Sequence, residues 1–70
     1  MKDNYFGKKL KELRLEKGLS QKELGKIFNV CNQTVSFWET GSREPDFDTL
    51  KNLADFFDVT INDFLGLNVD

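Results

Sequence analysis

A sharp turn between two short helices is the feature of this sequence that most restricts its fold. Ser20 and Glu23 have the spacing of a capping box, in which each side chain accepts a hydrogen bond from the backbone N–H of the other residue. The box predicts a helix from about Ser20 to Phe28. Asn29 follows at the position where a helix often ends with a positive φ, which asparagine tolerates better than any residue except glycine. The chain is therefore expected to change direction at Asn29.

The next helix is predicted from about Cys31 to Thr40, and Gly41 is the residue at which it stops. Only about three residues separate it from the preceding helix, and two short helices joined in this way form a helix-turn-helix. We therefore expect residues 20–40 to form this motif.

Three further helices are predicted around the motif. The first ends at Gly18, and the fourth follows Asp46, whose carboxylate can cap its N-terminus. A short fifth helix begins at Thr60, which makes a second capping-box match with Asp63, and ends before Gly66. No segment alternates apolar and polar residues as a strand does. The sequence thus predicts an all-α fold, a compact five-helix domain that contains the helix-turn-helix.

Apolar residues recur at helical spacing in the longer helices. No single stripe of this kind is wide enough to stabilise its helix alone, so the helices are expected to share one core. The stripe of the first helix contains Phe6, Leu10 and Leu13, and that of the fourth contains Phe47, Leu50, Ala54 and Phe57, with Leu53 beside it. The expected core consists of Leu10, Leu24, Ile27, Val35, Trp38, Leu50 and Val59.

The helix predicted over residues 31–40 has two faces of different character. Val35 and Trp38 share one face, which is expected to be buried. The other face carries two amides, a hydroxyl and an aromatic ring, from Asn32, Gln33, Ser36 and Phe37, and the phenyl ring is expected to stay largely exposed. Such amides can make paired hydrogen bonds to base edges in a DNA groove. The alternative for the same residues is an ordinary solvated helix surface.

Length and residue types exclude several classes of function. A chain of 70 residues allows one domain, expected to span residues 1–70, and leaves little room for a catalytic cleft. There is no histidine and Cys31 is the only cysteine, which excludes an internal disulfide, a Cys/His zinc site and a histidine acid–base centre. A lone thiol has no activating partner. We expect no metal, no cofactor, no small-molecule substrate and no enzymatic activity.

The apolar runs of the sequence are short. None approaches the roughly 18 residues of a membrane-spanning helix, and the N-terminal residues lack the apolar centre of a signal peptide. A single cysteine also agrees with a reducing compartment. A cytoplasmic protein without a membrane partner is therefore expected.

Charge is distributed unevenly, although the formal net charge is only −2. Residues 1–45 carry nine Lys and Arg against six Asp and Glu, whereas residues 46–70 carry one lysine against six aspartates. The first part can therefore attract phosphates, while the second forms an acidic body. The alternative is a solvated surface on which the uneven charge has no function.

Two stretches, "LKELRLEKGLSQKELGKIFNV" and "TVSFWETGSREPDFDTLKNLADFFDVTINDFLG", resemble the phage-repressor-like helix-turn-helix family, also known as XRE or Cro/C1-type regulators. The resemblance extends from Phe6 to Gly66 and is specific, because GLSQ-x-EL, E-x-G and REPD-x-x-TL-x-x-LA occur together at matching spacings. It implies a lambda-repressor-like domain that binds double-stranded operator DNA, usually as a homodimer, with its third helix in the major groove. The chain is then expected to be a bacterial or phage-encoded transcriptional regulator, with repression as the expected mode of action.

The resemblance also implies roles for single residues. Base contacts are implied for Asn32, Gln33, Ser36 and Phe37. Phosphate contacts are implied for Gln21, Thr40, Ser42 and Arg43. A helix N-terminus attracts a phosphate oxygen, which agrees independently with the position of Gln21. For Arg43 the alternative is a surface arginine without function.

An ion pair between Arg14 and Glu39, joining the first helix to the third, is likewise implied by the resemblance. The alternative is two separately solvated charges. Each residue lies near the apolar stripe of its helix. If the pair is buried, loss of one partner leaves an unpaired charge.

Three positions depart from the pattern of the family. Phe37 stands where a long polar or basic residue is common, so its ring could meet a thymine methyl group, a sugar or another protein. Cys31 stands where a hydroxyl usually caps the third helix, and we expect it to be a half-buried apolar residue. Gly25 replaces the customary alanine, which suggests that the third helix crosses close by.

The C-terminal residues Ile61, Phe64, Leu65 and Leu67 supply more apolar area than a short helix needs. They are candidates for a dimer surface, with core packing as the alternative. A second function remains open for the whole chain, namely an antitoxin-like or regulatory protein-interaction module that uses the same fold, Phe37 and the acidic second half.

Overall fold

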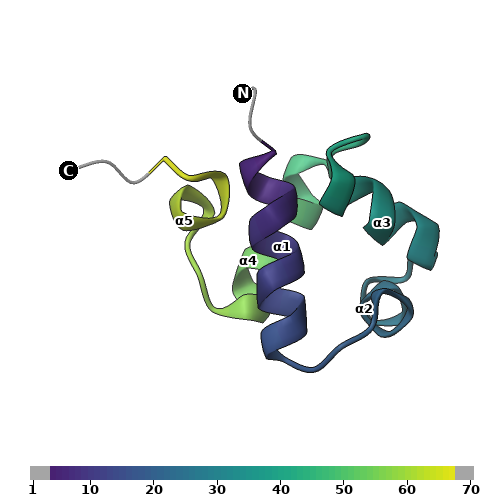
Figure 1. Cartoon of the computed structure of the whole chain (residues 1–70). Coiled ribbons are helices and arrows are strands. Elements are labelled where there is room, and N and C mark those ends of the chain that lie inside the picture. Colours follow the sequence, from purple (N-terminus) through teal and green to yellow (C-terminus); the bar gives the residue numbers. More distant parts are fainter. Residues whose placement is uncertain (1–3, 68–70) are drawn as a thin grey trace.

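Five α-helices form the regular structure of the computed structural model, which describes residues 4–67 (Figure 1). In chain order they are α1 (Tyr5–Glu16), α2 (Gln21–Phe28), α3 (Asn32–Thr40), α4 (Phe47–Phe57) and α5 (Ile61–Leu65). Residues 4–67 contain no β-strand, so the predicted all-α fold is confirmed. Within the same range, no helix combines the length and the apolar character needed to cross a bilayer.

Local hydrogen bonds begin α2, α4 and α5 where the sequence predicts them. The hydroxyl of Ser20 accepts from the backbone N–H of Glu23 at 3.0 Å, and the Glu23 carboxylate accepts from the backbone N–H of Ser20 at 2.8 Å. This is the predicted capping box of α2. Asp46 and Thr60 cap α4 and α5, each accepting a hydrogen bond from the backbone N–H three residues further on.

Residues in the left-handed conformation end α2 and α3 as predicted. Asn29 has a φ of 60° and Gly41 a φ of 84°. A side chain with a Cβ is strained in this region, which is why asparagine and glycine are favoured there. The short connection from Asn29 to Cys31 turns α3 back across α2 and produces the helix-turn-helix.

Helix α1 lies at the centre of the arrangement. It contacts α3 on one side and α5 on the other, while α2 packs against α3 and α4 packs against α5 (Figure 1). The helix-turn-helix therefore lies on the side of α1 that is opposite to α5.

The core gathers buried residues from all five helices. They are Leu10, Leu13, Leu24, Val35, Trp38, Leu53, Ala54, Phe57 and Phe64. Of the expected core residues, Leu10, Leu24, Val35 and Trp38 are buried, and Leu50 and Val59 are half-buried against this cluster.

Ile27 was wrongly assigned to the core, because its side chain is 51% exposed. The face of α2 that packs inward contains Leu24 and Gly25, and each helical residue turns by about 100° from its neighbour, so Ile27 falls on the flank of that face. Phe47, which the sequence places on the apolar stripe of the fourth helix, also lies outside the core. It is the first residue of α4 and is 64% exposed, with the amine of Lys51 lying 5.8 Å from the centre of its ring.

The C-terminal apolar residues differ from one another in burial. Phe64, expected as a candidate for the dimer surface, is 0% exposed, which corrects that expectation. Its ring lies 4.8 Å from that of Phe6 and 6.3 Å from that of Phe57, measured between centroids. Leu67 is 54% exposed, and Ile61 is half-buried. Helix α5 thus contributes the buried ring of Phe64 to the core, and Ile61 packs against the same cluster.

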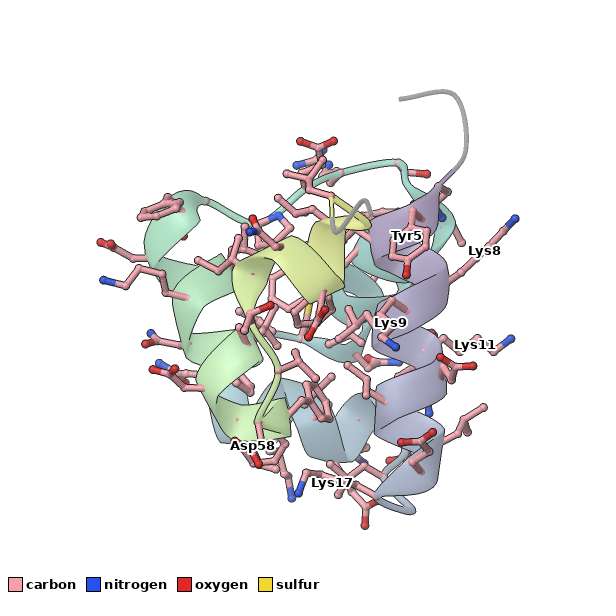
Figure 2. All side chains as sticks on the ribbon, turned by 90° about the vertical axis from the view of Figure 1, so that its left-hand side faces the viewer. Tyr5, Lys8, Lys9, Lys11, Lys17 and Asp58 are labelled. Carbon is pink, nitrogen blue, oxygen red and sulfur yellow. The ribbon has the colours of Figure 1, made fainter. Side chains whose placement is uncertain are left out.

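Basic side chains extend into solvent along α1. Lys8 and Lys11 are exposed and point away from the helix (Figure 2). Lys9 forms a surface ion pair with Glu12 at 3.7 Å. Exposed pairs of this kind contribute about 0–1 kcal/mol to stability, so these lysines are available mainly as a source of positive potential.

Candidate nucleic-acid interface

Helix α3 presents a buried face and a polar face. Val35, Trp38 and Glu39 are buried. Trp38 is only 5% exposed, which confirms the prediction that its ring lies on the buried face of the helix. Asn32 and Gln33, in the first turn of the helix, are exposed. The buried face fixes the helix to the core, so the two amides project from a rigid element.

Two other residues of the candidate reading face are less exposed than these amides. Ser36 and Phe37 are half-buried, which corrects the expectation that Phe37 stays largely exposed. The guanidinium carbon of Arg43 lies over the phenyl ring, 5.4 Å from its centre. This contact depends on the loop after α3, which helical periodicity does not describe.

The turn between α2 and α3 is held tightly against α2. The backbone N–H of Val30 donates to the carbonyl of Gly25 at 2.8 Å. A Cβ on Gly25 would lie 2.6 Å from the carbonyl oxygen of Val30 and 3.4 Å from the backbone nitrogen of Asn32. The close approach suggested by the sequence is therefore made by the turn and by the first residue of α3. Gly25 sets how near α3 begins to α2.

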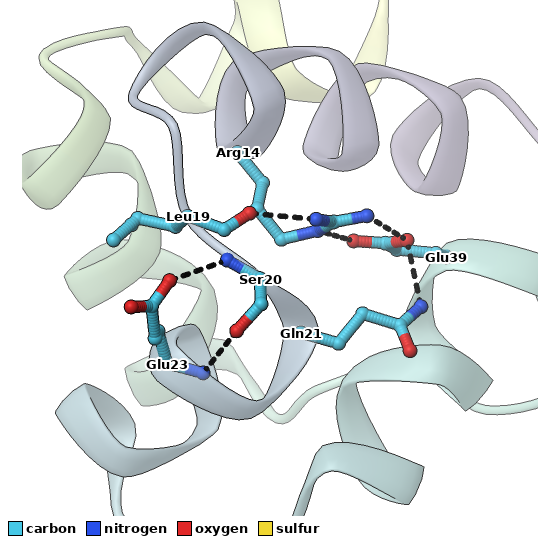
Figure 3. A network of polar contacts seen from close by, with 6 residues as sticks. All are labelled: Arg14, Leu19, Ser20, Gln21, Glu23 and Glu39. Atoms are coloured by element: carbon cyan, nitrogen blue, oxygen red, sulfur yellow. Dashed lines mark hydrogen bonds and ion pairs between the residues drawn. The ribbon is translucent and has the colours of Figure 1, made fainter.

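An ion pair between Arg14 and Glu39 lies at the centre of a polar network (Figure 3). The Arg14 Nε donates to one carboxylate oxygen of Glu39 at 2.6 Å, and its Nη2 donates to the other oxygen at 3.2 Å. Its Nη1 donates to the carbonyl of Leu19 at 2.7 Å. The two side chains are 8% and 4% exposed. The network therefore joins α1, the loop before α2 and α3 inside the protein.

Gln21 belongs to the same network. Its Nε2 donates to Glu39 at 3.1 Å, and its side chain is half-buried at the first position of α2 (Figure 3). A primary amide has two N–H donors, so the bond to Glu39 uses one of them. Glu39 thus orients the side chain of Gln21, for which the family resemblance implies a phosphate contact.

The other candidate phosphate contacts lie together at the C-terminal end of α3 and in the loop that follows it. Thr40, Ser42 and Arg43 are all exposed. The Thr40 hydroxyl donates to the carbonyl of Phe37 at 3.3 Å and lies 3.1 Å from the Ser42 hydroxyl. Asn32 and Gln33 lie at the other end of α3, so the site has an amide end and a hydroxyl–guanidinium end.

Cys31 is exposed at the N-cap of α3, which corrects the expectation of a half-buried residue. Its side chain makes no capping hydrogen bond, and its Sγ lies 3.3 Å from the Thr34 hydroxyl. Hydrogen bonds from the Thr34 hydroxyl and then from the Thr34 backbone lower the pKa of the thiol below its ordinary value. The cysteine directly precedes the two exposed amides in the chain.

Asn4 is a residue of the site region that sequence reasoning missed. Its side-chain oxygen accepts from the backbone N–H of Gly7 at 3.2 Å, and its Nδ2 donates to the backbone carbonyl of Glu39 at 2.7 Å. The signal was available in part, because asparagine is a preferred N-cap residue. Its second bond, to the end of α3, depends on how α1 crosses α3.

Comparison with known proteins places this geometry in a family. The helix-turn-helix family model matches residues 10–64. The chain is 40% identical over 61 residues to the HTH-type transcriptional regulator ImmR of Bacillus subtilis (strain 168), covering 87% of the chain and 48% of that protein.

Two further relatives differ in the direction of regulation that their names give. The HTH-type transcriptional activator BcrR of Enterococcus faecalis is 38% identical over 61 residues, covering 87% of the chain and 30% of that protein. The cryptic phage CTXphi transcriptional repressor RstR of Vibrio cholerae is 32% identical over 61 residues, covering 87% of the chain and 55% of that protein. The chain thus spans about half or less of the length of these relatives. With its five helices and its helix-turn-helix at α2 and α3, it belongs to the Cro/C1-type helix-turn-helix family of DNA-binding transcriptional regulators.

Proposed function

We propose that this chain binds double-stranded DNA at a specific operator sequence, with α3 lying in the major groove. The observation that carries the proposal is the placement of two exposed amides, Asn32 and Gln33, on the first turn of a helix that is fixed to the core by Val35 and Trp38. A recognition helix reads base edges with residues near its N-terminus. Amide side chains suit this task because they donate and accept hydrogen bonds at once.

The remaining polar residues supply the contacts that position the domain on the duplex. We assign base contacts to Asn32, Gln33 and Ser36, and phosphate contacts to Gln21, Thr40, Ser42 and Arg43. Phosphate contacts fix register and orientation without reading sequence. The separation of an amide end from a hydroxyl–guanidinium end of α3 supports this division of roles.

The distribution of charge also supports an orientation in which α3 faces the DNA. Residues 1–45, which include the helix-turn-helix, have an excess of three basic side chains over acidic ones, whereas residues 46–70 have an excess of five acidic ones. A negatively charged polymer is therefore attracted to the part of the chain that carries α3 and is repelled by the part that carries α4 and α5. The net charge of −2 is no obstacle, because the two signs lie in different parts of the chain.

Binding by one copy would read only a few base pairs. We propose a homodimer on DNA, since two recognition helices spaced by about 34–36 Å reach two successive major grooves. An open hollow supports a contact at α5, because Tyr5, Leu65 and Leu67 line one part of it, while Thr40 and Arg43 line another part. Asn32 and Gln33, in the first turn of α3, do not line the hollow and would remain accessible.

We propose repression of transcription as the mode of action, since a dimer seated on a promoter excludes other proteins from that DNA without a further contact. The proposed location is the cytoplasm of a bacterium, because the proposed partner is operator DNA. The proposed role is binding without catalysis. The exposed thiol of Cys31 is hydrogen-bonded to a hydroxyl, which cannot act as its general base.

Selection from a pool of random duplexes, followed by sequencing of the bound fraction, tests this function directly. The selected duplex and a scrambled version are then titrated at several salt concentrations. We expect tighter binding to the selected duplex and a logarithm of affinity that falls linearly with the logarithm of salt concentration, because phosphate contacts release counterions. Failure to bind any duplex at low salt would contradict the proposal and favour the protein-interaction module.

A further inference from the structure

We infer that Phe37 is a positioning residue, which holds the phosphate-facing loop and the guanidinium of Arg43 in place instead of reading a base. The inference rests on the proposed binding of DNA. It distinguishes, among the candidate base-contacting residues of α3, those that read bases from one that positions a phosphate contact. It assigns to the aromatic ring a role that its position on the reading face does not suggest.

The backbone carbonyl of Phe37 is the point at which the loop attaches to α3. It accepts a hydrogen bond from the Thr40 hydroxyl at 3.3 Å and another from the backbone N–H of Arg43, also at 3.3 Å. Ser42 joins the same group through its hydroxyl, 3.1 Å from that of Thr40. The last four carbonyls of a helix lack partners within the helix, so this one is open to such bonds. All three loop residues assigned to phosphate contacts are thereby tied to Phe37.

The side chain of Phe37 supports the only one of these residues that carries a charge. The guanidinium carbon of Arg43 lies 5.4 Å from the centre of the ring, within the range of a cation–π interaction. A long arginine side chain on a loop otherwise samples many rotamers, and ordering it on contact with DNA costs entropy. Stacking on the ring restricts those rotamers before DNA arrives.

The same contact reduces the part of the ring that can reach a base. Phe37 is half-buried, whereas Asn32 and Gln33 in the first turn are exposed. A ring partly covered by a guanidinium offers less apolar surface to a thymine methyl group. Phe37 is therefore expected to affect affinity for every duplex and to leave the choice of sequence to the amides.

A double-mutant cycle separates positioning from reading. The variants are Phe37→Leu, which removes the ring, Phe37→Tyr, which keeps it, Arg43→Ala, and the combination of Phe37→Leu with Arg43→Ala. Each is titrated with the selected duplex and a scrambled one over a range of salt concentrations. Thermal unfolding of each variant confirms that it is folded, and Phe37→Met replaces Phe37→Leu if the latter is not.

We expect Phe37→Leu to weaken binding to both duplexes by about two- to fivefold, the size of an exposed cation–π interaction. The salt dependence should become shallower in the same variant, because Arg43 is less often placed at its phosphate. Phe37→Tyr should bind like the original chain. In the Arg43→Ala background, Phe37→Leu should have almost no further effect, since the residue that it positions is gone.

Two results would overturn the inference while leaving DNA binding intact. One is an effect of Phe37→Leu that persists undiminished in the Arg43→Ala background. The other is a loss confined to the selected duplex, which would mean that the ring reads a base. Failure of the original chain to bind any duplex is a different outcome, which overturns the proposed function and this inference together.

Discussion

Arg14 and Glu39 form a buried ion pair in which two guanidinium nitrogens bind the two carboxylate oxygens, at 2.6 Å and 3.2 Å. The guanidinium also binds the carbonyl of Leu19, and the carboxylate also binds the amide of Gln21. One pair of charges therefore fixes α3 against α1 and against the beginning of α2. This arrangement determines the orientation of the helix that we propose as the reader.

Glu39→Ala should lower the free energy of unfolding by about 3–5 kcal/mol, because it leaves the Arg14 guanidinium buried without its charged partner. Urea denaturation measures this difference. The control is Glu12→Ala, which removes an exposed pair with Lys9 and should cost no more than about 1 kcal/mol. An equal decrease in the free energy of unfolding in the two variants would contradict the burial of the Arg14–Glu39 pair.

Trp38→Ala should lower the free energy of unfolding by about 3–5 kcal/mol, because the indole fills the core between the helices. Phe47→Ala is the matched control, since that ring is 64% exposed and its removal should change stability by about 0.5 kcal/mol or less. Trp38 is the only tryptophan, so its fluorescence reports its surroundings. Emission at the wavelength of a fully hydrated indole in the folded protein would contradict the burial of Trp38.

Gly25→Ala should destabilise the protein although alanine favours helices. The added Cβ would lie 2.6 Å from the carbonyl oxygen of Val30, so the turn must move away. Overpacking of this kind costs about 1–3 kcal/mol, against a gain of roughly 1 kcal/mol in helix propensity. The free energy of unfolding is compared with that of Lys26→Ala, an exposed site on the same helix. A more stable Gly25→Ala protein would mean that the turn has room to yield.

Gln33→Ala and Arg43→Ala should weaken DNA binding in different ways. Loss of the Gln33 amide should cost about 1–3 kcal/mol on the selected operator and much less on a scrambled duplex, with an unchanged salt slope. Loss of Arg43 should weaken both duplexes alike and reduce the salt slope by about one. Titrations at several salt concentrations distinguish the two patterns. If Gln33→Ala behaves like Arg43→Ala, α3 is not the reader.

Leu67→Asp should weaken the proposed dimer, because it replaces an apolar side chain that lines the hollow at α5 with a charged one. Leu15→Asp is the control, since Leu15 on α1 is similarly exposed, at 57% against 54%, but does not line the hollow. Sedimentation of protein with operator gives the number of chains on each duplex. A single chain on each operator at saturating protein concentration would rule out the dimer.

Features that depend on a few neighbouring residues could be predicted from the sequence. The capping box at Ser20 and the left-handed residues Asn29 and Gly41 are examples, as are the caps at Asp46 and Thr60. Each is formed by hydrogen bonds or backbone conformations that span no more than about four residues, so composition and spacing are sufficient. They establish where α2, α4 and α5 begin, where α2 and α3 end, and the turn between α2 and α3.

The tertiary structure decided which flank of each apolar stripe enters the core and which polar groups meet. Ile27 and Phe47 lie outside the core and Phe64 lies within it, because burial depends on the angle and reach of neighbouring helices. Contacts across the chain, such as Gln21 with Glu39, require those helices to be packed already. Even Phe37 and Arg43, six residues apart, meet only because the chain reverses at Gly41. Local bonds determine where helices begin and end, whereas the role of an exposed side chain depends on what packing brings beside it.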